Sequence, residues 1–319
     1  MTLRITAIHG RGMSKVHHLI EKHGLNEAKA MAETNADRLA IEAAAAVMAD
    51  EEQRMGITHA GFAMTSLPHK RTDLRVWKRE AGPVTLLLES GLEADETPVG
   101  IPYGSIARMI LLYLQTQAVR TQSREVELGG SMNAWLGNMG IAAGGKTYQL
   151  VREQSRRLSR CRLTFFRRAD RADRIVNGAF VREAIVPTDP NDEQLSLWQP
   201  RVVLDEGFYQ SLVEHPLPLR EAAIKEISSR SMTLDLYIWL AYRLHALKEP
   251  MPITWAALYS QFGGGYERPR DLKPRLIESL KLALAVYPEA QLEVDEAKGL
   301  TLLPSPPPVV ERHRRLGHT

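Results

Sequence analysis

Residues with the spacing of a phosphate-binding loop lie near the middle of the chain, in the stretch GIAAGGKTYQ. Gly140, Gly145, Lys146 and Thr147 fit G-x-x-x-x-G-K-[ST], in which backbone N–H groups and the lysine hold nucleotide phosphates. Such a loop follows a buried strand and begins a helix. The preceding SMNAWLGNMG has helical spacing instead, with Ser131 as a candidate N-cap. This context argues against a nucleotide site.

A second motif keeps a nucleotide hydrolase among the alternatives. RVVLDEGF at residues 201–208 resembles a hydrophobic strand that ends in two acids, Asp205 and Glu206, as in the Mg²⁺-binding strand of P-loop enzymes. The chain between the two motifs lacks the βαβ repeats of a parallel sheet. The simpler interpretation is that the glycines of the first motif form a tight turn between two helices. A P-loop ATPase is therefore the third hypothesis.

Positive charge is concentrated in the segment Lys146–Arg182. This segment holds eleven Lys or Arg residues and three acids, whereas the whole chain of 319 residues has a formal net charge of +3. A face that is only solvated usually mixes charges of both signs. The local excess of positive charge therefore favours a polyanionic partner.

The predicted helix that begins near Lys146 carries one polar stripe, because residues three or four apart share a helix face. The stripe consists of Gln149, Arg152, Arg156 and Arg160, opposite Tyr148, Val151, Ser155 and Leu158. Such a helix fits the major groove of double-stranded DNA, where Arg pairs with guanine and Gln with adenine. Lys146 begins this helix at the edge of the basic surface and is a further expected DNA contact. Phosphate contacts from the helix flank and the wing are expected for Arg157, Arg162, Arg167 and Arg168. The alternative is a solvated helix whose arginines contact only water.

A weaker basic set lies in the C-terminal third, before and within another predicted helix. It comprises Tyr266, Arg268, Arg270, Lys273 and Arg275. The hairpin expected after this helix is acidic, with Glu289, Glu293, Asp295 and Glu296. Any contact with DNA would therefore come from the start of the helix and its preceding loop. A purely structural role for this set is an equal alternative.

The elements that position these residues occur twice in the same order. The first copy runs from a helix capped by Ser105 through the strand REVEL, a short helix, a glycine-rich turn and the Lys146 helix to a hairpin. The second begins with a helix capped by Thr233 and ends with the hairpin QLEVDEAKGLTLL. Within the second copy, Thr254 caps the middle helix and Asp271 caps the third helix, with Pro274 in the first turn of that third helix. This is the order of a winged helix-turn-helix domain.

The sequence therefore predicts an α+β, mainly helical fold with two tandem winged helix-turn-helix domains and an N-terminal helical extension. Residues 26–54 are rich in strong helix formers and form this extension, either as a dimer arm or as a cover on the main body. The expected divisions are an extension at 1–56, a first winged-helix domain at 57–210, a second at 211–303, and a disordered Pro-rich and basic tail at 304–319.

Composition and residue types exclude several other classes of protein. Hydrophobic residues make up 44% of the chain and charged residues 25%, as in ordinary globular proteins. The lone cysteine, Cys161, excludes a disulfide framework and fits an apolar core position. His17, His18, His23, His313 and His318 lack metal-ligand spacing and are expected to be incidental exposed residues. No catalytic constellation can be assembled, so we expect no enzyme activity, no cofactor and no metal.

The location expected from the sequence is the cytoplasm. No apolar run approaches the ~18 residues of a membrane span, and the N-terminus carries no targeting signal. The true start, Met1 or Met13, stays open.

Two long stretches resemble the RepA-type plasmid replication initiators, namely PYGSIARMILLYLQTQAVRTQSREVELGGSMNAWLGNMGI and SRSMTLDLYIWLAYRLHALKEPMPITWAALYSQFGGGY. With the QSRRLSRCRLTFF junction, the resemblance covers roughly residues 60–305. It implies two winged-helix domains that bind repeated DNA sites, called iterons, at a plasmid origin, with helix-turn-helix elements at 131–160 and 254–285. It also implies origin opening, recruitment of the host initiator and helicase, and a monomer–dimer equilibrium that controls copy number. A winged-helix transcriptional repressor is the second hypothesis.

Overall fold

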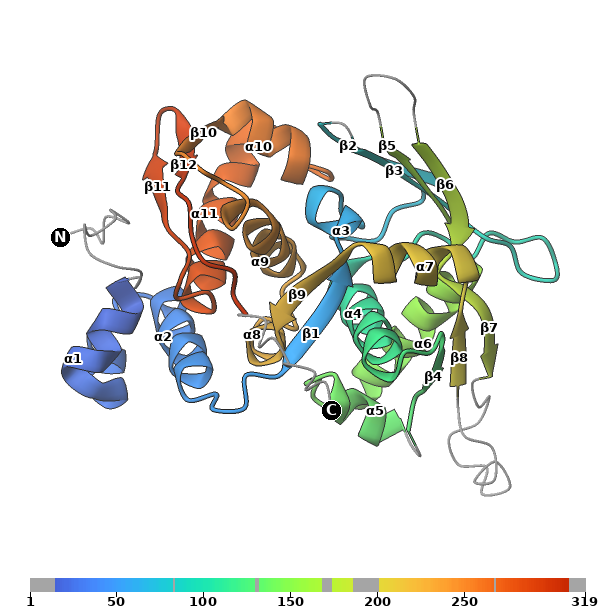
Figure 1. Cartoon of the computed structure of the whole chain (residues 1–319), viewed down its shortest axis with the longest axis horizontal. Helices are drawn as coiled ribbons and strands as arrows, with labels where there is room; N and C mark the ends of the chain where they lie inside the picture. The colour runs from blue at the N-terminus through green and yellow to red at the C-terminus, as the bar shows by residue number, and fades with distance from the viewer. Residues whose placement is uncertain are drawn as a thin grey trace, which may run out of the picture.

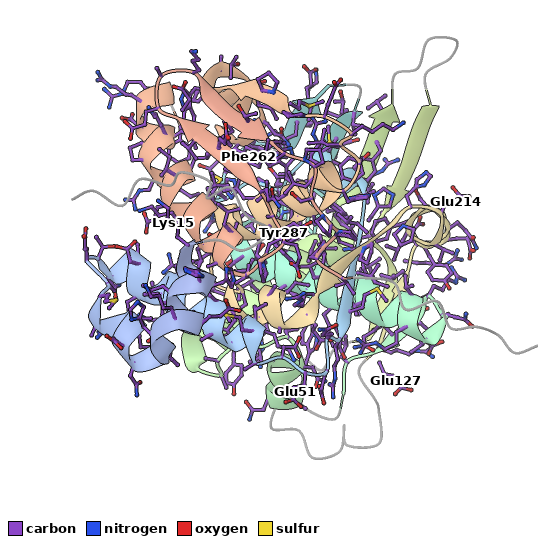
Figure 2. All side chains as sticks on the ribbon, turned by 60° about the vertical axis from the view of Figure 1, so that its left-hand side comes forward. Lys15, Glu51, Glu127, Glu214, Phe262 and Tyr287 are labelled. Atoms are coloured by element: carbon purple, nitrogen blue, oxygen red, sulfur yellow. The ribbon has the colours of Figure 1, made fainter. Side chains whose placement is uncertain are left out.

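Two lobes make up the chain, and Figure 1 shows them side by side, with the C-terminal lobe in orange and red. This computed structural model describes residues 15–82, 84–129, 132–167, 174–185, 201–266 and 268–309. A continuous set of buried apolar residues runs through both lobes. Figure 2 shows Tyr287 among the packed side chains of the interior, whereas Glu127 lies at the periphery.

The C-terminal lobe is a winged helix, as predicted. Its elements are α9 Ser231–Leu244, β10 Met251–Thr254, α10 Trp255–Phe262, α11 Pro269–Ala285, β11 Leu292–Asp295 and β12 Gly299–Leu302. β12 lies between β10 and β11, and both pairings are antiparallel. Thr254 caps α10 as predicted, because its side chain accepts a hydrogen bond from the backbone N–H of Ala257 at 3.2 Å.

The first unit repeats this order. Its elements are α4 Gly104–Thr121, β4 Glu125–Glu127, α5 Met132–Asn138, α6 Gly145–Arg160, β5 Arg162–Arg167 and β6 Arg174–Ala179. α4 and α9 are the corresponding first helices of the two units, and buried residues lie on most of their surface. The α+β, mainly helical fold with two tandem winged-helix units is therefore confirmed.

Additional strands enlarge the wing of the first unit. They are β2 Val76–Ala81, β3 Val84–Glu89, β7 Val181–Ile185 and β8 Arg201–Leu204, with α7 Glu206–Glu214 following β8. One sheet has the order β2-β3-β5-β6 and another the order β4-β8-β7. The wing hairpin β5–β6 therefore belongs to a four-stranded sheet, which the two-copy sequence pattern does not predict.

A two-stranded ribbon and two short helices lie between the lobes. The ribbon pairs β1 Met55–His59 with β9 Pro216–Arg220 in antiparallel register, so that Met55 lies opposite Arg220. The helices are α3 Gly61–Met64 and α8 Glu221–Glu226. β1 runs across the expected boundary at 56, and it pairs with β9, which lies beyond the expected boundary at 210.

Two helices form the N-terminal extension, where the sequence pattern indicates one. They are α1 Lys15–Ala30, which is kinked at Gly24 (φ 77°), and α2 Asn35–Met48. Thr34 begins α2 with a capping box, in which its hydroxyl oxygen accepts from the backbone N–H of Asp37 at 3.1 Å. α2 packs against α8 and α11. The extension covers the second unit, in agreement with the covering alternative rather than a free arm.

Three predicted helix starts differ from the structure. α4 begins at Gly104 after Tyr103, and α9 begins at Ser231 after Arg230, so Ser105 and Thr233 lie inside their helices. α11 begins at Pro269, which places Asp271 in the first turn and Pro274 in the helix interior. Tertiary packing sets these starts, because a capping residue type is favourable but is not required at a helix N-terminus.

The beginning of the expected disordered tail is ordered. Ser305 is buried, and its backbone N–H donates to the carbonyl oxygen of Leu244 at 3.2 Å. The hydroxyl of Tyr287 donates to the carbonyl oxygen of Pro306 at 2.6 Å, and Arg220 Nη2 donates to that of Pro308 at 3.0 Å. Residues 304–308 are therefore attached to the second unit, and residues 310–319 lie outside the described residues.

Candidate nucleic-acid interface

The outer face of α6 carries the predicted polar stripe. Val151 and Leu158 are buried on the inner face of the helix. The exposed residues on the outer face include Gln149, Arg152, Arg156 and Arg160. Lys146 is exposed in the first turn. The structure therefore places five of the predicted contact residues on one accessible surface, which we call the α6 basic face.

The segment before α6 is a helix and a turn, not a strand. α5 ends at Asn138, and Gly140 follows with φ 67°. A Cβ at Gly140 would lie 2.6 Å from Cγ of Lys225, so glycine is required there for both backbone and packing reasons. A Cβ at Gly144 or Gly145 would meet nothing within 4 Å. In the described residues every strand pairing is antiparallel, so the G-x-x-x-x-G-K-T match does not lie in the fold of a P-loop enzyme.

Asp205 and Glu206 each interact with other groups of the protein, and these interactions explain their positions after β8. Asp205 is the N-cap of α7, where its carboxylate accepts from the backbone N–H of Phe208 at 3.2 Å. Glu206 pairs with Arg124 Nη1 at 3.2 Å. RVVLDEGF is therefore an antiparallel strand followed by a helix cap, and it only resembles a Mg²⁺-binding strand in sequence.

The assignment of Arg157 to phosphate contacts is wrong. Its side chain is only 6% exposed. Nη2 donates to Glu153 Oε1 at 2.8 Å, Nη1 donates to the carbonyl oxygen of Ile101 at 2.9 Å, and the guanidinium lies 5.2 Å from the centre of the Tyr103 ring. The spacing of arginines along α6 could not reveal this role, because the partners come from the segment before α4. Arg157 fastens α6 to that segment.

The predicted wing is present, but its basic tip is only partly described. β5 pairs with β6, and Arg167 lies opposite Arg174 in this register. Arg162 is exposed at the start of β5. Arg168 lies outside the described residues, as does Ser131, the candidate cap of α5. Phosphate contacts by the wing stay a prediction.

An acidic loop lies against the α6 basic face, and the sequence pattern did not predict this contact. This loop, residues 90–99, joins β3 to α4 and contains Glu93, Asp95 and Glu96. The carboxylate of Glu93 pairs with Nε of Arg156 and lies 3.4 Å from Nη2 of Arg160. No local pattern signals the contact, because the paired residues are 63 positions apart.

The second unit presents fewer free cations. Arg270 and Arg275 are exposed, but Arg268 Nε pairs with Asp271 at 2.8 Å and Arg275 lies 3.7 Å from Glu278. Lys273 contacts the acidic hairpin. Its Nζ donates to the carbonyl oxygen of Glu296 and lies 4.9 Å from the ring centre of Trp255. Tyr266 is half-buried, and its carbonyl oxygen accepts from the hydroxyl of Tyr259 at 2.6 Å. Arg268, Lys273 and Arg275 therefore have partners within the second unit, and DNA contact by this set stays a prediction.

The N-terminal helices cover the C-terminal half of α11 and leave its basic beginning open. Lys281 lies 3.7 Å from Asp37, and Nε2 of His17 bonds the carbonyl oxygen of Ala285 at 2.8 Å. The expectation that His17 is an incidental exposed residue is wrong, since the residue is fully buried. Burial lowers the pKa of His17 from 6.5 to about 4. His18 is exposed as expected.

Cys161 has the environment of a core residue. It is buried at the end of α6, and burial raises the pKa of its thiol to about 12, so it carries no reactive thiolate at neutral pH. Within the described ranges, no three His, Cys, Asp or Glu side chains form a group that could hold a metal ion. In the same ranges no helix has the length and apolarity of a membrane span.

The fold and the α6 basic face together define a tandem winged-helix protein of the DNA-binding type. Residues 101–256 match the family described as plasmid encoded RepA protein, so the predicted relationship to RepA-type plasmid replication initiators is confirmed over this segment. The matched segment runs from the start of the first winged helix into α10 of the second. The match supports a role in plasmid replication for the chain. No curated protein matches the sequence.

Two solved structures of RctB domains are similar to this chain. A crystal structure of domains 2 and 3 of RctB matches with a TM-score of 0.53 at 13% identity, over 79% of this chain and 99% of that chain. A second crystal structure of RctB domains 2–3 gives a TM-score of 0.47 at 12% identity, over 75% of this chain and 93% of that chain. At this identity the first likeness concerns the fold alone.

Proposed function

We propose that this protein initiates plasmid replication by binding repeated sites in double-stranded DNA at the plasmid origin, without enzymatic activity of its own. The observation that carries the proposal is the α6 basic face, in which the helix after a helix–turn presents one glutamine and three arginines to solvent. Arginine and glutamine are side chains that recognise guanine and adenine in the major groove.

The charge of the interface supports a nucleic-acid partner over a small anion. Lys146, Arg152, Arg156 and Arg160 extend over the length of α6, which spans 16 residues. A helix of this length is about 24 Å long, which matches the extent of a major-groove contact rather than that of one phosphate group.

Two winged helices in one chain support binding to a long or repeated site. We propose that α6 supplies most base contacts and that Arg268, Arg270, Lys273 and Arg275 at the start of α11 add a weaker second contact.

Bound protein would open the adjacent DNA and recruit the host initiator and replicative helicase, and self-association would restrain copy number. The proposed division into 1–56, 57–210, 211–303 and 304–319 assigns one DNA contact to each winged helix. The cytoplasm is the compartment in which this role is carried out.

Footprinting of the purified full chain on the plasmid that carries its gene tests the proposal. We expect protected repeats spaced by whole turns of the double helix. Arg152→Ala with Arg156→Ala should abolish the protection. The matched control is Arg54→Ala, which removes an exposed arginine outside the winged helices, whose side chain pairs with Glu52 at 2.7 Å. A footprint that survives the double substitution would contradict the assignment of α6.

A winged-helix repressor shares the same fold and charge, and a second experiment separates the two functions. A plasmid that has only the protected repeats and this gene should be maintained if the protein is an initiator. If the repeats are protected but the plasmid is lost, and a promoter beside the repeats is silenced, the repressor alternative is correct.

A further inference from the structure

The acidic loop at residues 90–99 holds Glu93 in a fixed position against α6. The backbone N–H of Glu93 donates to the carbonyl oxygen of Thr97 at 2.9 Å, and that of Val99 donates to Gly91 at 2.9 Å. A Cβ at Gly91 would lie 2.2 Å from the carbonyl oxygen of Arg160, so the loop touches the end of α6 directly. The Glu93 side chain is only 18% exposed although it lies at the surface of the lobe.

The contact of Glu93 with Arg156 uses only one edge of the guanidinium group. Glu93 Oε1 accepts from Nε of Arg156. In the described part of the chain, no hydrogen bond or ion pair involves Nη1 or Nη2 of Arg156, and the side chain is 57% exposed. Two parallel N–H donors of one guanidinium can bond O6 and N7 of guanine together. The free Nη1 and Nη2 groups form such a pair.

Glu93 has two physical effects on the binding of DNA by α6. First, a long arginine side chain loses rotamer entropy when it binds, and part of this entropy is already lost when Glu93 orients the group before DNA binds. Second, the carboxylate offsets positive charge that would attract any DNA phosphate regardless of sequence. Orientation favours the matching base and raises the ratio of specific to non-specific affinity, whereas charge compensation lowers the affinity for every sequence.

We propose that Glu93 is a specificity-determining residue, which orients Arg156 toward a guanine in the major groove and suppresses sequence-independent binding. This inference rests on the proposed function, because it assigns a role within the same DNA contact. Glu93 acts through Arg156 and is therefore a positioning residue.

The test compares two duplexes and two variants of the full chain. The first duplex is enriched by the wild-type protein from a random library, and the second is a shuffled duplex of the same composition. Glu93→Gln removes the charge and weakens the bond to Nε with almost no change of shape. The matched control is Glu96→Gln, which makes the same change of charge in the same loop. Glu96 is exposed and, within the described part of the chain, has no hydrogen bond or ion pair with α6.

We expect Glu93→Gln to lower the ratio of the two affinities about tenfold, with tighter binding to the shuffled duplex. Glu96→Gln should tighten both affinities equally and leave the ratio within about twofold. In an Arg156→Ala background, Glu93→Gln should not change the ratio further, and a repeated selection with Glu93→Gln should lose the preference for guanine at one position. These last two results would not follow from a merely structural role.

Equal ratios for Glu93→Gln and Glu96→Gln would overturn the role of Glu93, and so would a full effect in the Arg156→Ala background. If the wild-type protein enriches no sequence at all, the proposed function fails as well. Enrichment of a sequence by the wild type together with an unchanged ratio for Glu93→Gln refutes the role of Glu93 alone.

Discussion

Arg108 of α4 and Asp235 of α9 form a two-bond ion pair between the first helices of the two winged-helix units. Nε donates to Oδ1 at 2.6 Å and Nη2 to Oδ2 at 2.7 Å, with side chains 5% and 7% exposed. The guanidinium also donates to the backbone carbonyl oxygens of Leu67, Pro68 and Gly104. This pair fixes one unit against the other, and therefore sets the spacing of the two DNA contacts that we propose.

Removal of the Asp235 charge should destabilise the fold strongly. We expect Asp235→Asn to lower the free energy of unfolding by about 3–5 kcal/mol, because Arg108 stays buried without a counter-charge. Urea denaturation measures the change. Glu52→Gln, which breaks the exposed Arg54–Glu52 pair, should change it by about 1 kcal/mol or less. Similar losses in both variants would show that the buried pair has no special weight.

Arg156 and Arg157 are neighbours in sequence but should behave differently when truncated. We expect Arg156→Ala to weaken binding to a specific duplex by ~1–3 kcal/mol at fixed salt, with an unchanged unfolding midpoint. Arg157→Ala should lower the unfolding midpoint instead, because Glu153 and the carbonyl of Ile101 lose their buried donor. Calorimetric and fluorescence titrations measure both. Unchanged affinity in Arg156→Ala would remove this residue from the interface.

The wing arginines should contribute to the salt dependence of DNA binding. Each phosphate contact adds ~0.9 to the slope of log K against log salt concentration. Replacement of Arg167 and Arg168 by alanine should therefore flatten the slope by up to about 2 units. A slope identical to that of the wild type would show that the wing tip does not contact phosphates.

Stability should fall as the pH decreases through the range in which three largely inaccessible histidines become protonated in the unfolded chain. Burial is the main cause that lowers the pKa of His17, His59 and His69 from 6.5 to about 4 in the folded protein. The unfolded chain therefore binds more protons between these values. The contribution of each histidine, at most about 3 kcal/mol, is complete above about pH 6.5 and is lost as the pH falls through about 4.

His17→Gln should reduce this dependence on pH. Denaturation at a series of pH values is expected to give a shallower slope for His17→Gln than for the wild type, whereas the exposed neighbour His18 serves as the control in His18→Gln. If both variants keep the slope of the wild type, burial of His17 does not contribute to it.

Lys146 should contribute to DNA binding and not to nucleotide binding. Because a helix and a turn precede it, we expect equilibrium dialysis with ATP and Mg²⁺ to detect no nucleotide bound to the wild type. Lys146→Ala should weaken DNA binding modestly, and more at low salt than at high salt. ATP binding that disappears in Lys146→Ala would restore the nucleotide-hydrolase hypothesis.

The elements closest to the prediction are those with strong local signals. Regular apolar spacing predicted α6 and α11, and the Thr254 cap and the β11–β12 hairpin follow from local residue types. The same spacing predicted that Arg152, Arg156 and Arg160 face solvent. Local signals suffice for these features because helix periodicity and turn chemistry act over a few residues.

Other features depend on contacts between distant residues and could not be predicted in this way. The enlarged wing needs β3 beside β5, and the place of the extension on the second unit depends on the packing of α2 against α8 and α11. His17 gave no sign of burial, since its partner, the carbonyl oxygen of Ala285, is 268 positions away.

The amino-acid sequence determined the two-copy element order and the basic character of α6, because both depend on residue types within one turn or one hairpin. Only the tertiary structure decided which arginines of α6 are accessible at its surface. Arg157 is buried against Ile101 and Glu153, whereas its neighbour Arg156 is exposed and paired with Glu93. The physical reason is that the environment of a charge is set by whatever packs against it, and packing joins segments that the local sequence pattern treats as independent.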